Sequence, residues 1–188
     1  DIEWVQGRAD RLQHKKPPVR VSPAPTGVEL GDLLERGELD FLITANNPLS
    51  FRRKAPTVRR LFPNYRELEQ DYYRRTKIYP IMHTVVLQRR VLETHPWIAV
   101  NLMDAFRASK DLAFARLADP RATSLAWASD LLDEQRRVLG DDPWCYAFGP
   151  NRENLATAIR WAHEQGLIDR PFPPEDLFAP STLDVLPT

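Results

Sequence analysis

The run YRELEQDYYRRTKIYPIMHTVVLQRRVLETHPW, residues 65–97, decides how the rest of the chain can be arranged. Its first part, residues 65–75, contains neither Gly nor Pro and many strong helix formers, so we expect a charged helix that Pro80 ends. Residues 81–87 are mostly β-branched or long apolar side chains, which predicts a short buried strand. The run therefore predicts a polar helix followed directly by an apolar strand.

His83 lies inside this apolar run and has two interpretations. As a core residue it would need hydrogen-bond partners for its ring nitrogens, because burying an unpaired polar group costs free energy. As a catalyst it would suit proton transfer, since imidazole is the side chain that ordinarily titrates near neutral pH. Alternation along a strand would place His83 on the same face as Ile81 and Val85. His83 is the best candidate for proton chemistry in the sequence.

Composition and charge exclude several classes of protein. The 188 residues suffice for one domain or two small lobes with a full core. The 26 basic and 26 acidic side chains cancel, so the positive charge typical of nucleic-acid binding is missing. No apolar run approaches the roughly 18 residues that a membrane span requires, and no signal-peptide pattern precedes the first motif. We expect a soluble, cytoplasmic protein that binds neither nucleic acid nor membrane.

The first third of the sequence predicts an α/β arrangement. Short apolar runs at residues 2–5 and 19–22 are typical of strands. A short helix over residues 30–35 leads into a continuous apolar strand over residues 39–44. Strand, helix and strand in this order indicate a parallel sheet, which binds ligands at the carboxyl ends of its strands.

Two polar regions beside this sheet are candidates for ligand binding. Asn46 and Asn47 follow the apolar strand, where their amides suit either a substrate or an ordinary turn before Pro48. Residues 51–60 are the most basic part of the chain. They are interpreted either as a solvated loop or as a patch that steers an acidic substrate.

Helices dominate the remaining two thirds. The pattern predicts three more of them, over residues 93–117, 124–139 and 151–165. Thr94 and Asn151 are suited to cap the first and the third. The proline-rich tail predicts an extended strap with one helical turn at residues 175–178. A thin sheet cannot cover the apolar faces of so many helices. We therefore expect a second copy of the chain to bury the remaining apolar surface in a homo-oligomer.

The cysteine and the histidines, which could act as nucleophile or metal ligands, form no recognisable motif. The lone cysteine, Cys145, is more typical of a small buried hydrophobe than of a nucleophile. The four histidines show no HxH or HExxH spacing, so we predict no metal and no cofactor. His95 is interpreted as a helix-entry residue, His163 as a surface or packing residue and His14 as solvated. A metal site shared between distant histidines stays an alternative.

Several motifs resemble the 4,5-dihydroxyphthalate decarboxylase family, and the likeness covers most of the chain. They include GELD at residues 37–40, RLFPNY at 60–65, YYRRTKIYPIMHT at 72–84 and AHEQGL at 162–167. That family is longer at its N-terminus and resembles type II periplasmic binding proteins, in which two α/β lobes enclose a ligand cleft. By this resemblance the chain is a partial two-lobed α/β architecture with a helix-rich C-terminal two thirds. Residues 1–80 correspond to the end of the second lobe with a connecting helix, and residues 81–188 to a hinge-crossing strand and a helical return to the first lobe.

The resemblance implies non-oxidative decarboxylation, without a cofactor, of 4,5-dihydroxyphthalate or a similar aromatic dicarboxylic acid. His83 is predicted to transfer the proton. The predicted carboxylate-binding residues are Arg74, Arg75 and Lys77, because Arg offers a bidentate grip. Adjacent helical residues diverge by about 100°, so only one of the two arginines can face the cleft. The alternative is a domain of the same fold that binds a small aromatic or anionic ligand without catalysis.

Overall fold

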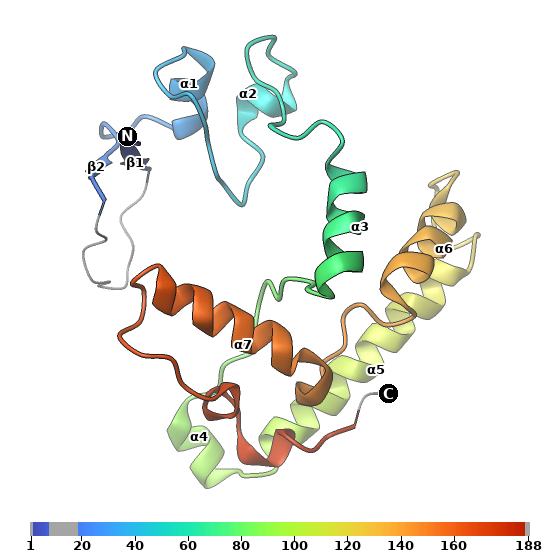
Figure 1. Cartoon of the computed structure of the whole chain (residues 1–188). Helices are drawn as coiled ribbons and strands as arrows, with labels where there is room; N and C mark the ends of the chain where they lie inside the picture. Colours follow the sequence, from blue (N-terminus) through green and yellow to red (C-terminus); the bar gives the residue numbers. More distant parts are fainter. Residues whose placement is uncertain (1, 8–18, 187–188) are drawn as a thin grey trace. The chain divides into compact units, whose positions relative to one another are not determined.

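A computed structural model describes residues 2–7 and 19–186 of the chain. The chain divides into two compact units, one of Asp1–Arg66 with Ala162–Asp169 and one of Glu67–Trp161 with Arg170–Thr188 (Figure 1). The structure is mixed α/β with helices predominating after the first third, as the sequence predicts. The interpretation of His14 falls outside the described residues.

The first unit contains a small parallel sheet. Its two strands are β1 (Trp4–Gln6) and β2 (Val21–Pro23), and Trp4 lies opposite Val21 in the register. The N–H of Ala24 donates to the carbonyl of Gln6 at 2.8 Å, which extends the pairing by one step. The strands predicted at residues 2–5 and 19–22 are therefore confirmed, each displaced by one or two residues.

Two short helices pack closely in the same unit. They are α1 (Leu30–Glu35), which has the bounds that the sequence predicts, and α2 (Leu49–Arg52), which the sequence analysis missed. A Cβ atom added at Gly31 would lie only 2.7 Å from Cβ of Pro48, so this contact requires glycine. Ser50 is fully buried, and its hydroxyl donates to the carbonyl of Gly31 at 3.2 Å. The buried hydroxyl of Ser50 thus has the hydrogen-bond partner that a buried polar group requires.

Residues 39–44 do not form the predicted apolar strand. The segment is irregular, and Phe41 and Ile43 are exposed. The prediction was wrong because apolar, β-branched composition reports only that a side chain fits a sheet, whereas a strand also needs a neighbour to bond. Among the described residues the sheet consists of β1 and β2 alone, so the expected strand, helix and strand unit is not formed.

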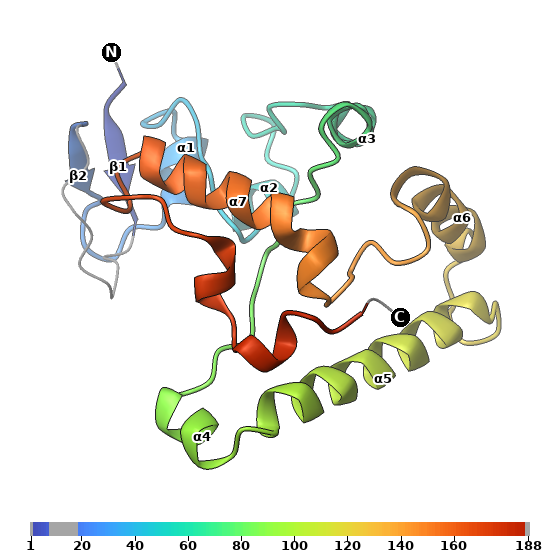
Figure 2. The same cartoon turned by 60° about the horizontal axis from the view of Figure 1, so that its bottom comes forward.

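The second unit is mostly helical. It contains α4 (Arg89–Thr94), α5 (Ile98–Ala118) and α6 (Ala128–Leu139), most of α3 (Tyr65–Thr76) and of α7 (Phe148–Glu164), and the 3₁₀ turns η1 (Pro174–Leu177) and η2 (Pro180–Thr182). Two views of the chain show α6 lying beside the end of α5 (Figures 1 and 2). The Nε2 of Gln70 in α3 donates to Oε1 of Glu134 in α6 at 2.5 Å. None of the helices in the described part of the chain is both long and apolar enough to cross a membrane.

The single helix predicted over residues 93–117 is in fact two. Helix α4 ends at Thr94, and α5 begins at Ile98 after a break that contains Pro96. Thr94 caps nothing, because its hydroxyl donates back to the carbonyl of Arg90 at 2.8 Å. The ring of His95 lies 5.7 Å from the ring of Trp97, which agrees with a residue at a helix entry.

Asn151 also differs from its predicted role as a helix cap. Helix α7 begins three residues earlier, at Phe148. The Nδ2 of Asn151 instead donates to the carbonyls of Cys145 at 2.7 Å and Ala147 at 2.9 Å. This amide therefore holds the preceding loop against the first turn of α7, and Cys145 within that loop is half-buried.

The tail has the predicted helical turn, η1, and a second one, η2, that the sequence analysis missed. The ring of Phe178 lies edge-on to the ring of Phe148 at 5.5 Å. The Nε of Arg152 donates to Oε1 of Glu175 at 2.7 Å. The pKa of Glu175 is lowered, first by its own backbone N–H and then by Arg152. Farther along, the buried side chain of Arg107 donates to the carbonyl of Leu186. Several separate contacts thus hold the strap on α5 and α7.

Residues 81–87 are neither a strand nor buried. They are extended between α3 and α4, and none of their backbone groups takes part in a backbone–backbone hydrogen bond. Met82 and Val86 are 69% and 85% exposed. The prediction of a buried strand was wrong for the same reason as at residues 39–44, since the described chain offers this segment no neighbouring strand.

Candidate functional site

The C-terminal end of α3 carries the two arginines that the sequence predicts as carboxylate ligands. The Nε of Arg75 donates to Oδ2 of Asp71 at 2.8 Å, so this guanidinium already has a counter-charge. The Nη2 of Arg74 donates to the neutral amide oxygen of Gln70 at 2.9 Å, and no acidic side chain in the described part of the chain forms an ion pair with this guanidinium. Both arginines are exposed. Of the two, Arg74 is the better suited to bind an anion.

Lys77 ends the helix in an unusual conformation. Its φ of 58° lies in the left-handed region, which helix ends normally fill with Gly because other L residues pay about 1 kcal/mol or more there. The N–H of Lys77 donates to the carbonyl of Tyr73 at 2.8 Å, and the hydroxyl of Thr76 accepts from the N–H of Ile78 at 3.1 Å. The ammonium of Lys77 lies 5.4 Å from the centre of the Tyr73 ring. This turn brings a second cation to the same end of α3.

His83 is an exposed side chain on the extended segment that follows this turn. The interpretation of His83 as a core residue is therefore wrong, since the structure provides no core around it. Three of its apolar neighbours, Ile81, Met82 and Val85, are exposed as well. Exposure leaves both ring nitrogens accessible to a bound molecule.

An aromatic cluster connects this segment to a distant loop. The rings of Tyr73 and Tyr79 meet edge to face at 6.5 Å, and those of Tyr79 and Trp144 at 5.1 Å. Burial raises the pKa of Tyr79, and the nearby charge of Glu69 raises it further. Tyr79 therefore stays neutral and partly buried between a ring from α3 and a ring from the loop before α7.

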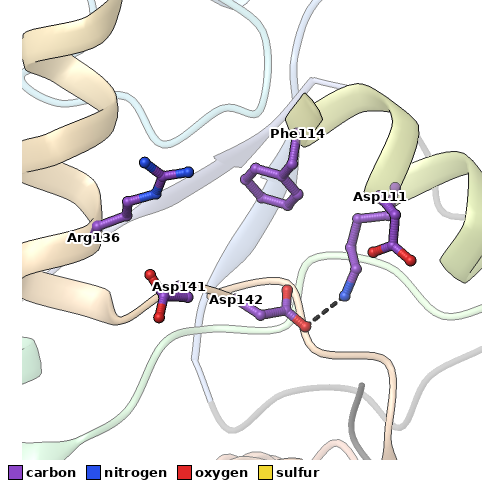
Figure 3. A pocket seen from close by; sticks show the side chains of 6 residues that line it. Asp111, Phe114, Arg136, Asp141 and Asp142 are labelled. Carbon is purple, nitrogen blue, oxygen red and sulfur yellow. Dashed lines mark hydrogen bonds and ion pairs between the residues drawn. The ribbon is translucent and has the colours of Figure 1, made fainter. Parts of the chain in front are cut away.

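The loop that carries Trp144 is fixed to α5 by one buried lysine. The Nζ of Lys110 contacts Oδ2 of Asp142 at 2.5 Å, the contact drawn as a dashed line in Figure 3. The same Nζ donates to the carbonyl of Trp144 at 3.3 Å. It also lies 4.7 Å from the centre of the Tyr146 ring. Only 8% of the Lys110 side chain is exposed, against 25% for Asp142. The Oδ1 of Asp142 is buried and has no hydrogen-bond partner.

A hollow of about 260 Å³ lies beside this ion pair (Figure 3). It is lined by Lys110, Asp111, Phe114, Arg136, Asp141 and Asp142. Three carboxylates face two cations, so the lining carries a net negative charge. A dicarboxylate would be repelled there, and the basic end of α3 suits an anionic substrate better.

Asn46 and Asn47 belong to the first unit, whereas His83 and the basic residues of α3 belong to the second. The N–H of Asn46 donates to the hydroxyl oxygen of Thr44 at 3.3 Å, which is local turn chemistry. Both side chains are exposed. Their proposed contact with a substrate stays a prediction.

Sequence reasoning missed the residues that organise the aromatic cluster. Lys110 and Asp142 are 32 positions apart, and no motif joins them. The dense aromatic segment DDPWCYAFGP, residues 141–150, was the available signal, because so many large rings in a short loop require partners. No group of three or more His, Cys, Asp or Glu within residues 2–7 and 19–186 could hold a metal ion.

Comparison with known proteins bears on the chemistry of this site. No family model matches the chain. The chain is 35% identical, over 193 residues, to a 4,5-dihydroxyphthalate decarboxylase of Comamonas testosteroni. The chain is related to the 4,5-dihydroxyphthalate decarboxylases. The similarity covers 98% of this chain but 58% of the Comamonas decarboxylase, so the chain spans less than two thirds of that relative.

Proposed function

We propose that the natural protein carrying this sequence decarboxylates 4,5-dihydroxyphthalate, or a similar aromatic dicarboxylic acid, without oxidation. The observation that carries the proposal is the 35% identity to a decarboxylase over nearly the whole chain. The proposal includes the two-lobed architecture of type II periplasmic binding proteins and a cytoplasmic location. In it, residues 1–80 contribute to one lobe and residues 81–188 to the hinge and the other lobe.

The proposed reaction needs a base, an acid and positive charge. Each ring hydroxyl of 4,5-dihydroxyphthalate is para to a carboxylate, and loss of its proton pushes electrons to the carbon that bears the carboxylate. A general acid protonates that carbon, the carbon–carbon bond breaks, and carbon dioxide leaves as the ring regains aromaticity. His83 would supply the proton, and its exposure on the extended segment supports this role. Arg74 and Lys77 would hold the carboxylates, with Arg75 less available because of Asp71.

The test is to incubate the natural polypeptide with 4,5-dihydroxyphthalate and follow the decarboxylated catechol acid by liquid chromatography. Phthalate is the control ligand, because it has both carboxylates but lacks the hydroxyls that drive the electron shift. We expect turnover of the first compound and binding without turnover of the second. Tight binding of both with no product would contradict the decarboxylase and favour the ligand-binding alternative, with Asn46 and Asn47 among the binding groups.

We also propose that the protein is a homo-oligomer. Residues 81–87 of the second unit expose several apolar side chains, and such a surface is one that association would cover. Light scattering at micromolar concentration should therefore give more than the monomer mass, which is 21.7 kDa for these residues. Replacing Val86, which is 85% exposed, with Lys should shift the protein toward the monomer. A monomeric unaltered protein would contradict the proposal.

A further inference from the structure

We propose that Trp144 is a positioning residue for catalysis, acting through its ring contact with Tyr79 to set the place of His83. The inference rests on the proposed function. Trp144 lies far from His83 in the sequence, and no motif links the two. The argument for it comes from the contacts on either side of the extended segment.

Tyr79 is the anchored residue nearest His83 on its N-terminal side. Its ring is held between the rings of Tyr73 and Trp144. Beyond it, residues 81–87 form no backbone–backbone hydrogen bond, and α4 begins only at Arg89. Four residues of extended chain reach at most about 14 Å, so the anchor at Tyr79 limits where the imidazole can be placed.

The same anchor sets the distance between the proton donor and a carboxylate ligand. Lys77 precedes Tyr79 by two residues, and its left-handed turn fixes the direction in which the chain leaves α3. Lys77 and His83 therefore flank the held residue Tyr79 along the sequence. Catalysis depends steeply on such placement, because an error of about 1 Å can lower the rate by about 100-fold.

Trp144 is itself held, which makes it able to serve as an anchor. Lys110 of α5 contacts every second residue of the loop that carries Trp144. The contacts are with the carboxylate of Asp142, the carbonyl of Trp144 and the ring of Tyr146. The loop is thus fastened to α5 by a side chain that is nearly fully buried. Trp144 nonetheless remains 44% exposed, so its ring contributes less to the core than its size would allow. The ring contact in which Trp144 takes part is the one with Tyr79, at 5.1 Å.

The test replaces Trp144 with Ala in the natural polypeptide. We expect kcat for 4,5-dihydroxyphthalate to fall about tenfold, and Trp144→Phe to recover the rate to within about twofold, because a ring edge is restored. Trp127→Ala is the matched control, since Trp127 is 73% exposed and its ring meets no other aromatic ring of residues 2–7 and 19–186. Its kcat should equal that of the unaltered protein. A kcat unchanged in Trp144→Ala, or lowered equally in Trp127→Ala, would overturn the inference.

A second variant tests whether the two rings act through their shared contact. Tyr79→Leu removes the ring contacts with both Tyr73 and Trp144, so it should lower kcat at least as much as Trp144→Ala, and the double variant should be no slower than Tyr79→Leu alone. If the two losses in kcat multiplied in the double variant, the inference would be overturned.

Backbone ¹⁵N relaxation gives a readout that does not need turnover. Residues 81–87 should become more mobile in Trp144→Ala and not in Trp127→Ala. Absence of turnover in the unaltered protein would refute the proposed function, and relaxation would still decide whether Trp144 holds the segment. Unchanged mobility in Trp144→Ala would refute the anchor.

Discussion

Replacing His83 with Asn should lower the turnover of 4,5-dihydroxyphthalate by roughly 100-fold or more, the usual scale for losing a general acid or base. Asn keeps much of the shape and one amide donor but cannot exchange a proton near neutral pH. Substrate binding should change much less, because the carboxylates are assigned to Arg74 and Lys77. The melting temperature should stay the same, since His83 is exposed and exposed substitutions rarely alter stability by more than about 0.5 kcal/mol.

The measurement is kcat and KM from product formation, together with thermal unfolding of both proteins. His163→Asn is the matched control, because His163 is an exposed histidine in α7, outside the proposed site. A stable His83→Asn variant with full activity would remove His83 from the mechanism. A lowered melting temperature with normal turnover would assign His83 to packing instead.

Replacing Asp142 with Ala should lower the free energy of unfolding by about 3 kcal/mol, the lower end of the range for breaking a buried ion pair. The change leaves the ammonium of Lys110 without its counter-charge. The carbonyl of Trp144 and the ring of Tyr146 remain as weaker partners. Water compensates the ammonium only in part, because only 8% of the Lys110 side chain is exposed.

Urea unfolding measures this loss. Asp71→Ala is the control, since it removes the exposed pair with Arg75 and should cost less than about 1 kcal/mol. The double change Lys110→Met with Asp142→Leu should recover most of the lost stability, because apolar side chains of similar size need no charge partner. The explanation fails if Asp142→Ala is no more destabilising than Asp71→Ala.

Local signals in the sequence predicted the helices well. Helix α3 follows from eleven residues without Gly or Pro, and α6 and α7 end close to Gly140 and Gly166, whose φ values of 87° and 73° only glycine adopts easily. The break at Pro96 was misjudged because Pro fits the first turn of a helix as well as the gap between two helices. Where a helix ends depends on a few residues that are neighbours in the chain, so it can be predicted from the sequence alone.

The strands and the anchor of the site depend on residues far apart in the chain. The β-branched and apolar side chains of residues 81–87 are suited to a sheet. No local feature shows whether another strand is available to pair with this segment. The basic end of α3 and His83 could be proposed as a site because they lie within one continuous motif. The contact of Tyr79 with Trp144 and the pairing of Lys110 with Asp142 arise only from packing, so no spacing rule could predict them.

The extended segment also determines how proteolysis would affect the protein. A protease binds its substrate as an extended strand with free backbone groups, and residues 81–87 already have this form. A cut between Tyr79 and His83 would separate the imidazole from Lys77 and from the ring that holds the chain. A cut after Val86 would leave these groups on one fragment. The position of a single broken bond would therefore decide whether a nicked molecule keeps its proton donor beside its carboxylate ligand.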